Sequence, residues 1–408
     1  MVKEWPSILI GDVFEFKNGL SKGKEFFGQG TPFISYSEVY KYNSLKAADI
    51  RGRVHLTKEE ISKLAVQKND VFFTKTSETP EEVGYSAVLL EDVPDCVFNG
   101  FVLRARPKNN WLFPGYCKYC FSTKAVRDEI AKRCKFTTRA GITGRALSEI
   151  EIPLPPMGEQ KAISEVLDVL ETQIQNLSGL IEKKRSIRDG ALEDLIRHRT
   201  RLDGFNDEWA TVTFNQVITP KARIGWQGLK KHEYLRNGYS YLIGGADFSH
   251  GTINRDSIWY VSKERYDMDV NIQVSENDVL VTKDGTIGKV AIVPELGKPA
   301  TLNSGVFVFR TNNKLSPTFL FRVLSSSVFR EFIDTLSAGS TIKHLYQKDL
   351  KNFEFEIPVD KKEQEAIADT LTAMDEEIEA LEMERDKMIQ IREGAMDDLL
   401  TGRVRLAI

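Results

Sequence analysis

Residues 188–195 read Arg-Asp-Gly-Ala-Leu-Glu-Asp-Leu, and residues 392–399 read Arg-Glu-Gly-Ala-Met-Asp-Asp-Leu. The two stretches lie 204 positions apart, and the same offset links Glu159-Gln160 to Glu363-Gln364. Repeat units of solenoid proteins run to roughly 20–50 residues. A period this long therefore indicates a duplicated half-molecule. The sequence predicts two similar halves related by a pseudo-twofold axis, and two similar halves are expected to bind two similar targets.

The bulk composition is that of an ordinary globular protein of more than one domain. A chain of 408 residues exceeds what one hydrophobic core usually organises, and 41% hydrophobic with 28% charged residues is typical of globular proteins. The chain shows no apolar run long enough to cross a bilayer and no signal-peptide core. Four cysteines without a framework spacing favour a reducing compartment. We expect a cytoplasmic protein that does not contact membranes.

The charge is unevenly distributed along the chain. Residues 358–408 hold 14 acidic and 7 basic side chains, whereas the whole chain has a net charge of −3. The remainder of the chain is therefore mildly basic. An acidic helix is more suited to meeting a protein than a phosphate backbone.

Each half reads as a mixed α/β region followed by a long helix. Residues 70–74 and 278–282 are rich in β-branched and aromatic residues, as strands are. Prolines near 152–156 and at 358 then stop the chain from continuing as strand or helix. The predicted fold class is α+β with two long antiparallel coiled-coil helices. Its predicted domains are a first recognition domain (1–155), a first helical spacer (156–200), a second recognition domain (201–357) and a second helical spacer (358–408).

The two predicted helices share a narrow apolar seam. Its members alternate four and three apart, which is heptad spacing. A helix of about 40 residues is about 60 Å long, more than its own domain can cover. We therefore expect the helices to pack on each other in antiparallel fashion, although each could instead lie on its own domain. The seam residues are Ile163, Leu167, Leu170, Ile174, Leu177, Ile181, Ile367, Leu371, Met374, Ile378 and Leu381.

The sequence carries no recognisable signature for covalent chemistry. Phosphate-binding loops, dinucleotide-binding turns and a methyltransferase signature are all missing. Cys117 and Cys120 are spaced like half of a zinc site, but the repeat places Leu320 and Val323 at the corresponding positions. Buried apolar cysteines are therefore the better interpretation. We predict no catalytic residue, no metal site and no cofactor site in this chain.

Polar segments that recur in both halves are candidates for nucleic-acid recognition. Lysine and arginine contact phosphates, and lysine, arginine, glutamine and hydroxyl side chains contact base edges. Any single segment could equally be a solvated basic loop, but matched positions in both halves favour a function. The candidates are Lys75, Thr76, Ser77, Lys135, Thr137, Thr138, Arg139, Lys221, Arg223, Trp226, Lys230, Lys283, Ser340, Thr341, Lys343 and His344.

The boundary sequences resemble a known family. Residues 152–160 read Ile-Pro-Leu-Pro-Pro-Met-Gly-Glu-Gln before the first helix, Ile357-Pro358 and Glu363-Gln364 precede the second, and residues 399–406 read Leu-Leu-Thr-Gly-Arg-Val-Arg-Leu. With the alternation of α/β region and repeated helix, they resemble the specificity subunit of type I restriction–modification enzymes. Residues 359–362 stand where the family has its second Pro-Pro, so the sequence departs from the family at this turn.

The resemblance implies how such a chain would work. Two target-recognition domains would each read one half of an asymmetric, bipartite site in double-stranded DNA. The antiparallel helices would act as a spacer and would dock two DNA-methyltransferase subunits, with restriction–translocase subunits joining through them. S-adenosylmethionine, ATP and magnesium would belong to these partners, and this chain would be non-catalytic.

Two other functions remain as alternatives. A self-contained restriction–methylation enzyme would need the catalytic signatures that the sequence lacks. A coiled-coil adaptor without DNA binding would leave the paired basic segments without a role. A salt-dependent DNA-binding assay separates the adaptor from the recognition subunit.

Overall fold

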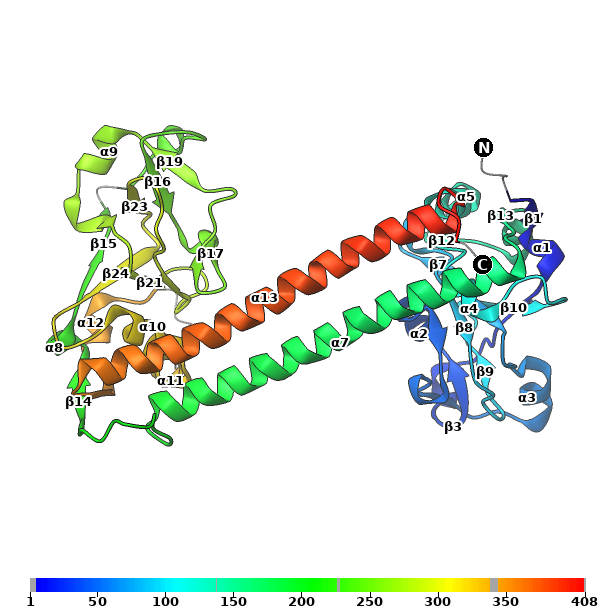
Figure 1. The fold of residues 1–408 in the computed structure, drawn as a ribbon, viewed down its shortest axis with the longest axis horizontal. Coiled ribbons are helices and arrows are strands. Elements are labelled where there is room, and N and C mark those ends of the chain that lie inside the picture. The colour runs from blue at the N-terminus through cyan, green and yellow to red at the C-terminus, as the bar shows by residue number, and fades with distance from the viewer. Residues whose placement is uncertain (1–4, 137, 226–227, 338–343, 407–408) are drawn as a thin grey trace. The chain divides into compact units, whose positions relative to one another are not determined.

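The chain divides into two compact units that cut across its long helices. A computed structural model describes residues 5–136, 138–225, 228–337 and 344–406. Unit 1 comprises Met1–Ser178 with Glu382–Ile408, and unit 2 comprises Gly179–Leu381. Each unit therefore holds one globular domain and one half of each long helix (Figure 1). The predicted spacer segments are shared between units because each helix end packs on a different core.

Unit 1 is built around a five-stranded sheet of order β2-β10-β6-β8-β4. The central strand β6 is antiparallel to both of its neighbours, β10 and β8. All four residues of β6 are buried, which explains its run of three apolar residues before Thr74. The strands are β1 (Ser7–Leu9), β2 (Phe14–Asn18), β3 (Phe27–Ile34), β4 (Ser44–Leu45), β5 (Gly52–Val54), β6 (Val71–Thr74), β7 (Thr76–Ser77), β8 (Ser86–Leu89), β9 (Val97–Phe98), β10 (Val102–Pro107), β11 (Lys135–Phe136), β12 (Ala140–Gly141) and β13 (Glu151–Pro153). The short helices are α1 (Ile10–Val13), α2 (Tyr36–Lys41), α3 (Lys58–Leu64), α4 (Pro114–Cys117), α5 (Lys124–Arg133) and α6 (Gly144–Ser148).

Unit 2 repeats the central strands of unit 1. Its sheet has the order β15-β24-β21-β22, and β21 is again antiparallel to both neighbours. A second four-stranded sheet has the order β19-β16-β23-β20. The strands are β14 (Trp209–Thr213), β15 (Ile218–Ala222), β16 (Ser240–Ile243), β17 (Phe248–Ser249), β18 (Thr252–Ile253), β19 (Trp259–Val261), β20 (Gln273–Val274), β21 (Val279–Thr282), β22 (Val290–Ile292), β23 (Ala300–Leu302), β24 (Val306–Thr311) and β25 (Glu354–Pro358). The short helices are α8 (Phe214–Val217), α9 (Lys263–Asp267), α10 (Pro317–Ser325), α11 (Ser327–Ser337) and α12 (Gln347–Leu350).

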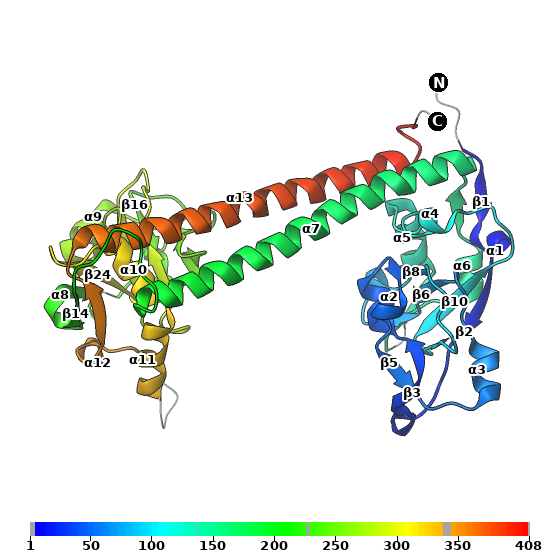
Figure 2. The same cartoon turned by 60° about the horizontal axis from the view of Figure 1, so that its bottom comes forward.

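The long helices are α7 (Met157–Ile196) and α13 (Lys361–Leu400), each of 40 residues. Within each unit their two halves lie side by side and run in opposite directions (Figures 1 and 2). In unit 1 Arg392 pairs with Glu171 at 2.9 Å, and in unit 2 Arg188 pairs with Asp375 at 3.4 Å. These two ion pairs are related by the 204-residue repeat. The predicted α+β class with two long antiparallel helices is confirmed.

The seam residues divide between two packing partners. Ile163 and Leu167 lie in the core of the first domain, and Ile367 and Leu371 lie in the core of the second. The first turns of each helix therefore pack on their own domain. Farther along each helix the seam stays buried at Ile174, Ile181 and Ile378, while Leu170, Leu177, Met374 and Leu381 are half-buried.

A buried carboxylate closes each unit at the start of its long helix. Glu363 accepts hydrogen bonds from Arg201 Nε at 2.8 Å and Trp209 Nε1 at 3.3 Å. In the other unit Glu159 accepts them from Arg405 Nε at 2.6 Å and from the indole of Trp5 at 3.1 Å. A charge-assisted bond to a planar guanidinium is stronger and more directional than a neutral one. Each glutamate thus joins the start of one long helix to the segment that follows the other long helix and to a tryptophan at or near the first strand of the domain.

The neighbouring glutamines hold the turn that begins each long helix. Gln160 Oε1 accepts the Phe113 backbone N–H at 2.7 Å, and its Nε2 donates to Pro155 O at 2.9 Å. Gln364 makes the same pair of bonds in unit 2, to the Ser316 N–H and to Pro358 O, both at 2.8 Å. Both amides are buried, and a buried amide needs such partners. A glutamine therefore holds the turn before both helices, although in unit 2, where residues 359–362 replace the second Pro-Pro, its proline partner lies one residue farther away along the chain.

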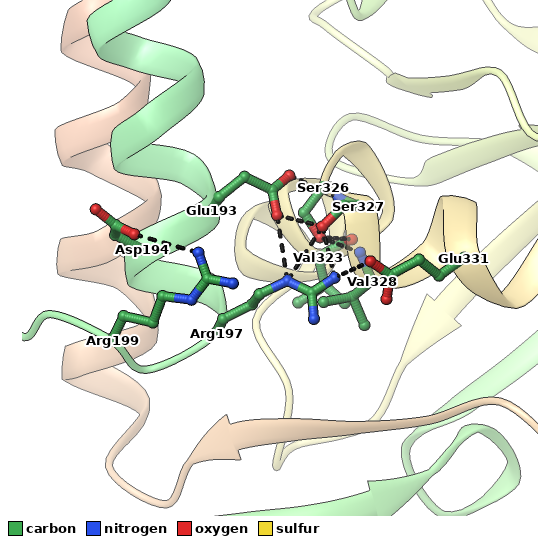
Figure 3. A network of polar contacts seen from close by, with 9 residues as sticks. All are labelled: Glu193, Asp194, Arg197, Arg199, Val323, Ser326, Ser327, Val328 and Glu331. Atoms are coloured by element: carbon green, nitrogen blue, oxygen red, sulfur yellow. Dashed lines mark hydrogen bonds and ion pairs between the residues drawn. The ribbon is translucent and has the colours of Figure 1, made fainter.

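The repeated Arg-Asp-Gly-Ala segment also anchors α11 in unit 2. Glu193 accepts the Ser327 backbone N–H at 2.7 Å, at the first residue of α11. Arg197 donates to Ser327 Oγ at 2.6 Å and pairs with Glu331 (Figure 3). A carboxylate at a helix N-terminus is favoured by the helix dipole. This network fixes α11 on the last turn of α7.

The described helices include none that is long and apolar enough to cross a bilayer.

We predict that Arg405→Ala destabilises unit 1 by about 1.5–3 kcal/mol, because hydrogen bonds to charged groups contribute about this much and Glu159 would be left buried without its cation. The control is Arg403→Ala, since the Arg403 side chain is 60% exposed and its pairs with Asp397 and Asp398 lie at the surface. Exposed pairs contribute about 0–1 kcal/mol. Urea unfolding followed by tryptophan fluorescence measures both changes, and equal shifts for the two variants would contradict the prediction.

The effect of Arg405→Ala should also depend on pH. The hydrogen bond from Arg405 lowers the pKa of Glu159 below its ordinary value of 4.5. A carboxylate with a lowered folded-state pKa stabilises the fold fully above the unfolded-state value and loses that contribution as the pH falls through the folded-state value. The difference between wild type and variant should therefore be full near neutral pH and shrink below 4.5.

Candidate nucleic-acid interface

The candidate residues of unit 1 meet at one edge of its main sheet. β6 ends at Thr74, and Lys75 follows it. The Lys75 backbone N–H donates to Phe101 O at 2.8 Å, and its carbonyl accepts the Ile142 N–H at 3.0 Å. Its ammonium group donates to Asn18 Oδ1 at 2.9 Å. Lys75 is therefore held in place at the end of the central strand.

The basic segment of residues 132–141 adds a small sheet beside Lys75. Strand β12 pairs with β7 on one side and with β11 on the other. This pairing brings Thr76 and Ser77 beside the segment that contains Lys135. Thr138 and Arg139 are exposed in the connection between β11 and β12, and Arg139 pairs with Glu78 at 3.2 Å. Candidate Thr137 lies outside the described residues.

Ser77 is already engaged by two side chains. Its hydroxyl donates to Glu82 at 2.5 Å and accepts from the Tyr36 hydroxyl at 3.2 Å. A hydroxyl has one donor proton, so Ser77 would have to exchange partners before it could donate to a ligand. Thr76 and the nearby lysines carry the better-placed polar groups at this edge.

Unit 2 places Lys283 in the same framework. Its backbone N–H donates to Gly305 O at 2.9 Å, and its carbonyl accepts the Leu345 N–H at 2.8 Å. His344 forms a bridge with Asp284, and its Nδ1 lies 2.5 Å from the Asp284 carboxylate. The turn of Lys283 and the segment of His344 and Leu345 thus meet, as the turn of Lys75 and the segment of Lys135 and Arg139 do in unit 1. Candidates Ser340, Thr341 and Lys343 lie outside the described residues.

The remaining segment of unit 2, residues 221–232, is less well suited to recognition. Lys221 is half-buried on β15, and Lys230 is exposed at the start of a short turn of helix. Arg223 is only 3% exposed and donates through Nε to Leu302 O at 2.9 Å. Burial lowers its pKa. The Arg223 guanidinium thus lies inside the domain rather than at its surface, so Arg223 is the least accessible of the described candidates, and its contact with DNA stays a prediction. Trp226 lies outside the described residues.

The cysteines belong to the core of unit 1. Cys117 and Cys120 are buried among apolar side chains, and Leu320 and Val323 occupy the matching positions in the core of unit 2. Burial raises the pKa of Cys120 well above its ordinary value, which disfavours the thiolate that metals bind. In the described ranges no group of three potential ligands forms a metal site.

Exposed aromatic rings at the same edge of unit 1 were not among the candidates. Phe101 and Tyr85 are exposed, and they precede β10 and β8 on either side of β6. The signal lies in the comparison of the halves, since Asn99-Gly100-Phe101 matches Asn303-Ser304-Gly305. From periodicity alone, both rings would be assigned to the core, because each directly precedes a buried strand.

Comparison with known proteins gives one consistent family. A family model described as "Type I restriction modification DNA specificity domain" matches residues 2–183 and 206–390. The putative type I restriction enzyme MjaX specificity subunit of Methanocaldococcus jannaschii is 25% identical over 99% of this chain and 94% of its own length. The type I restriction enzyme EcoBI specificity subunit of Escherichia coli is 26% identical over 55% of this chain and 52% of its own.

A solved structure shares the fold. The crystal structure of a type I restriction-modification system S subunit from M. genitalium has a TM-score of 0.61 to this chain. It is 17% identical, and the match covers 97% of this chain and 96% of that one.

We predict that Arg139→Ala weakens DNA binding and lowers the slope of binding against salt by about one unit if Arg139 contacts a phosphate. If it contacts a base edge instead, one position of the recognised sequence should relax at a cost of about 1–3 kcal/mol. The matched control is Arg145→Ala, another exposed arginine paired with a glutamate, Glu149, at 3.5 Å. Binding isotherms at several salt concentrations test this, and identical behaviour of both variants would identify the Arg139 loop as merely solvated.

Proposed function

This chain belongs to the type I restriction modification DNA specificity family, and from that premise we propose that each of its units reads one half of a bipartite, asymmetric DNA site. Membership makes the chain the subunit that recognises DNA sequence for a restriction–modification system. As a specificity subunit it is the non-catalytic member of such a system, as predicted. S-adenosylmethionine, ATP and magnesium would then be bound by its partner subunits.

The observation that carries the proposal is a repeated framework with different side chains. In both units a lysine follows the central strand, and its backbone N–H and carbonyl bond to two loops that are equivalent in the two units. The exposed side chains around that lysine differ, with Phe101 and Tyr85 in unit 1 but Gly305 and Lys289 in unit 2. Phosphate contacts need only a similar backbone and cations, whereas base contacts depend on side-chain chemistry. Two half-sites of different sequence suit this arrangement.

We further propose that α7 and α13 dock two DNA-methyltransferase subunits, with restriction–translocase subunits joining through these. Ile187 is 50% exposed on α7 in unit 2, and Ile391 is 44% exposed on α13 in unit 1. They are equivalent in the 204-residue repeat and stand next to Arg188 and Arg392. An exposed apolar residue repeated once in each unit fits two copies of one partner.

The test of the bipartite site is a domain exchange. We predict that replacing residues 7–155 with the matching segment of a relative changes one half of the recognised sequence and leaves the other half intact. The exchanged segment includes both of the paired strands β1 and β13. It leaves out Trp5, Glu159 and Arg405, which therefore keep their contacts. Sequencing of methylated sites in cells that carry the methyltransferase partner reads the result. A change in both halves, or in neither, would refute separate reading by the two units.

The docking proposal predicts that a change on either helix reduces the number of bound methyltransferase subunits. Ile187→Asp and Ile391→Asp should each reduce the bound methyltransferase from two copies to one, since loss of a buried apolar anchor typically costs about 2 kcal/mol or more. The control is Val169→Asp, because Val169 is also exposed on α7 but its repeat partner is Ala373. Native mass spectrometry of the assembled complex counts the copies. If both isoleucine variants still bind two copies with unaltered affinity, the partners dock elsewhere.

A further inference from the structure

The edge of the main sheet that holds Lys75 in unit 1 and Lys283 in unit 2 differs between the units in the position of its aromatic rings. Phe101 precedes β10, Tyr85 precedes β8, and Lys75 follows β6 between them. In unit 2 the matching positions around β21 are Gly305 and Lys289. Unit 1 thus carries rings at two positions where unit 2 carries glycine and lysine, although unit 2 has an exposed ring of its own nearby at Tyr346, next to Leu345.

Hydrogen bonds establish that these positions are equivalent. The Lys75 N–H donates to Phe101 O at 2.8 Å, and the Lys283 N–H donates to Gly305 O at 2.9 Å. One residue earlier in each strand, a buried threonine hydroxyl accepts the backbone N–H of Tyr85 in unit 1 and of Lys289 in unit 2, at 2.9 Å in both. The difference is therefore one of side chain on the same backbone.

The loop that carries Phe101 is held firmly. Its backbone N–H donates to Asn99 Oδ1 at 2.6 Å, and Leu20 N–H donates to the Phe98 carbonyl at 2.8 Å. The backbones approach so closely that a Cβ on Gly100 would lie 2.6 Å from Leu20 O. Yet the Phe101 side chain is 54% exposed. A ring on a fixed loop keeps a defined position, which lowers the entropic cost of using it for binding.

A single exposed ring needs no explanation, but this edge gathers several beside cations. Phe136 on β11 is exposed and next to Lys135, and the β11-β12-β7 sheet joins it to the turn of Lys75. The acidic groups nearby are Glu78, which pairs with Arg139, and Glu82, which accepts from Ser77. Rings and cations in one place match the bases and phosphates of DNA.

We propose that Phe101 makes an apolar contact with a base in the half-site that unit 1 reads and so helps to determine its sequence. This inference rests on the function proposed above. The ring can pack on a thymine methyl group or insert at a base step, and both are apolar contacts that discriminate between sequences. Unit 2 has Gly305 at this position and therefore lacks this particular contact, and the groups around Gly305 include Lys289 and the paired His344 and Asp284.

The test is Phe101→Gly in the full chain assembled with its methyltransferase, which gives unit 1 the residue that unit 2 already has. The control is Trp111→Ala, because Trp111 is a comparably exposed ring beyond the other end of β10. Methylation of a DNA library randomised in both half-sites is read by sequencing. Thermal unfolding of each variant shows that the fold is retained.

We expect Phe101→Gly to lose roughly 10- to 100-fold of discrimination at one position of the first half-site, with the second half-site unchanged and Trp111→Ala like wild type. Replacing thymine by uracil at that position should reduce wild-type binding if the ring packs on the methyl group. Fluorescence of 2-aminopurine at the neighbouring step should rise on binding if the ring inserts. Either response supports the inference and identifies the mode.

An unaltered motif in the Phe101→Gly variant would overturn the inference. So would weakened methyltransferase assembly with the remaining methylation still at the wild-type motif, which would make Phe101 a protein contact. In both of these outcomes wild type still reads its site, so the proposed function stands. If wild type itself shows no bipartite motif, the proposed function fails together with this inference.

Discussion

A buried carboxylate at the start of each long helix holds each unit together. Glu159 and Glu363 each bind a guanidinium and an indole from segments distant in sequence. A buried carboxylate without such partners would cost several kcal/mol, so the start of one long helix, the segment after the other long helix and the tryptophan must assemble together. In unit 1 the arginine comes from the last residues of the chain, and in unit 2 it comes from the segment that follows α7. The same contact thus appears in both units, with an arginine that follows α13 in unit 1 and an arginine that follows α7 in unit 2.

The same duplication frees the exposed surface to diverge. The bonds that repeat are made by buried or backbone groups, such as the amides of Gln160 and Gln364 and the backbone around Lys75 and Lys283. Exposed positions on that framework contribute little to stability, so a phenylalanine in one unit can stand where the other has glycine. A specificity subunit needs this separation, because a change of recognised sequence must leave the assembly intact.

A comparison of Arg223 with Arg139 shows how burial separates arginines that stabilise the domain from arginines that could contact DNA. Arg223 and Arg139 look alike as sequence, each in a segment of basic and polar residues. Arg223 donates to a main-chain carbonyl inside its domain, whereas Arg139 stands at the surface on a short hairpin connection. A cation can reach a phosphate only if its solvated head remains outside, so accessibility decides between the two roles.

The sequence by itself determined the duplication, the α+β class and the approximate start of both long helices, and it indicated that basic segments recur in both halves. It did so because repeats, prolines and heptad spacing are local patterns that report backbone geometry directly. Only the tertiary structure decided that the first seam residues, such as Ile163 and Ile367, pack on their own domains, that Arg223 is buried, and that Phe101 stands exposed beside Lys75. These outcomes depend on which strands become neighbours in a sheet and which surfaces another element covers, and contacts between distant residues leave no period in the chain.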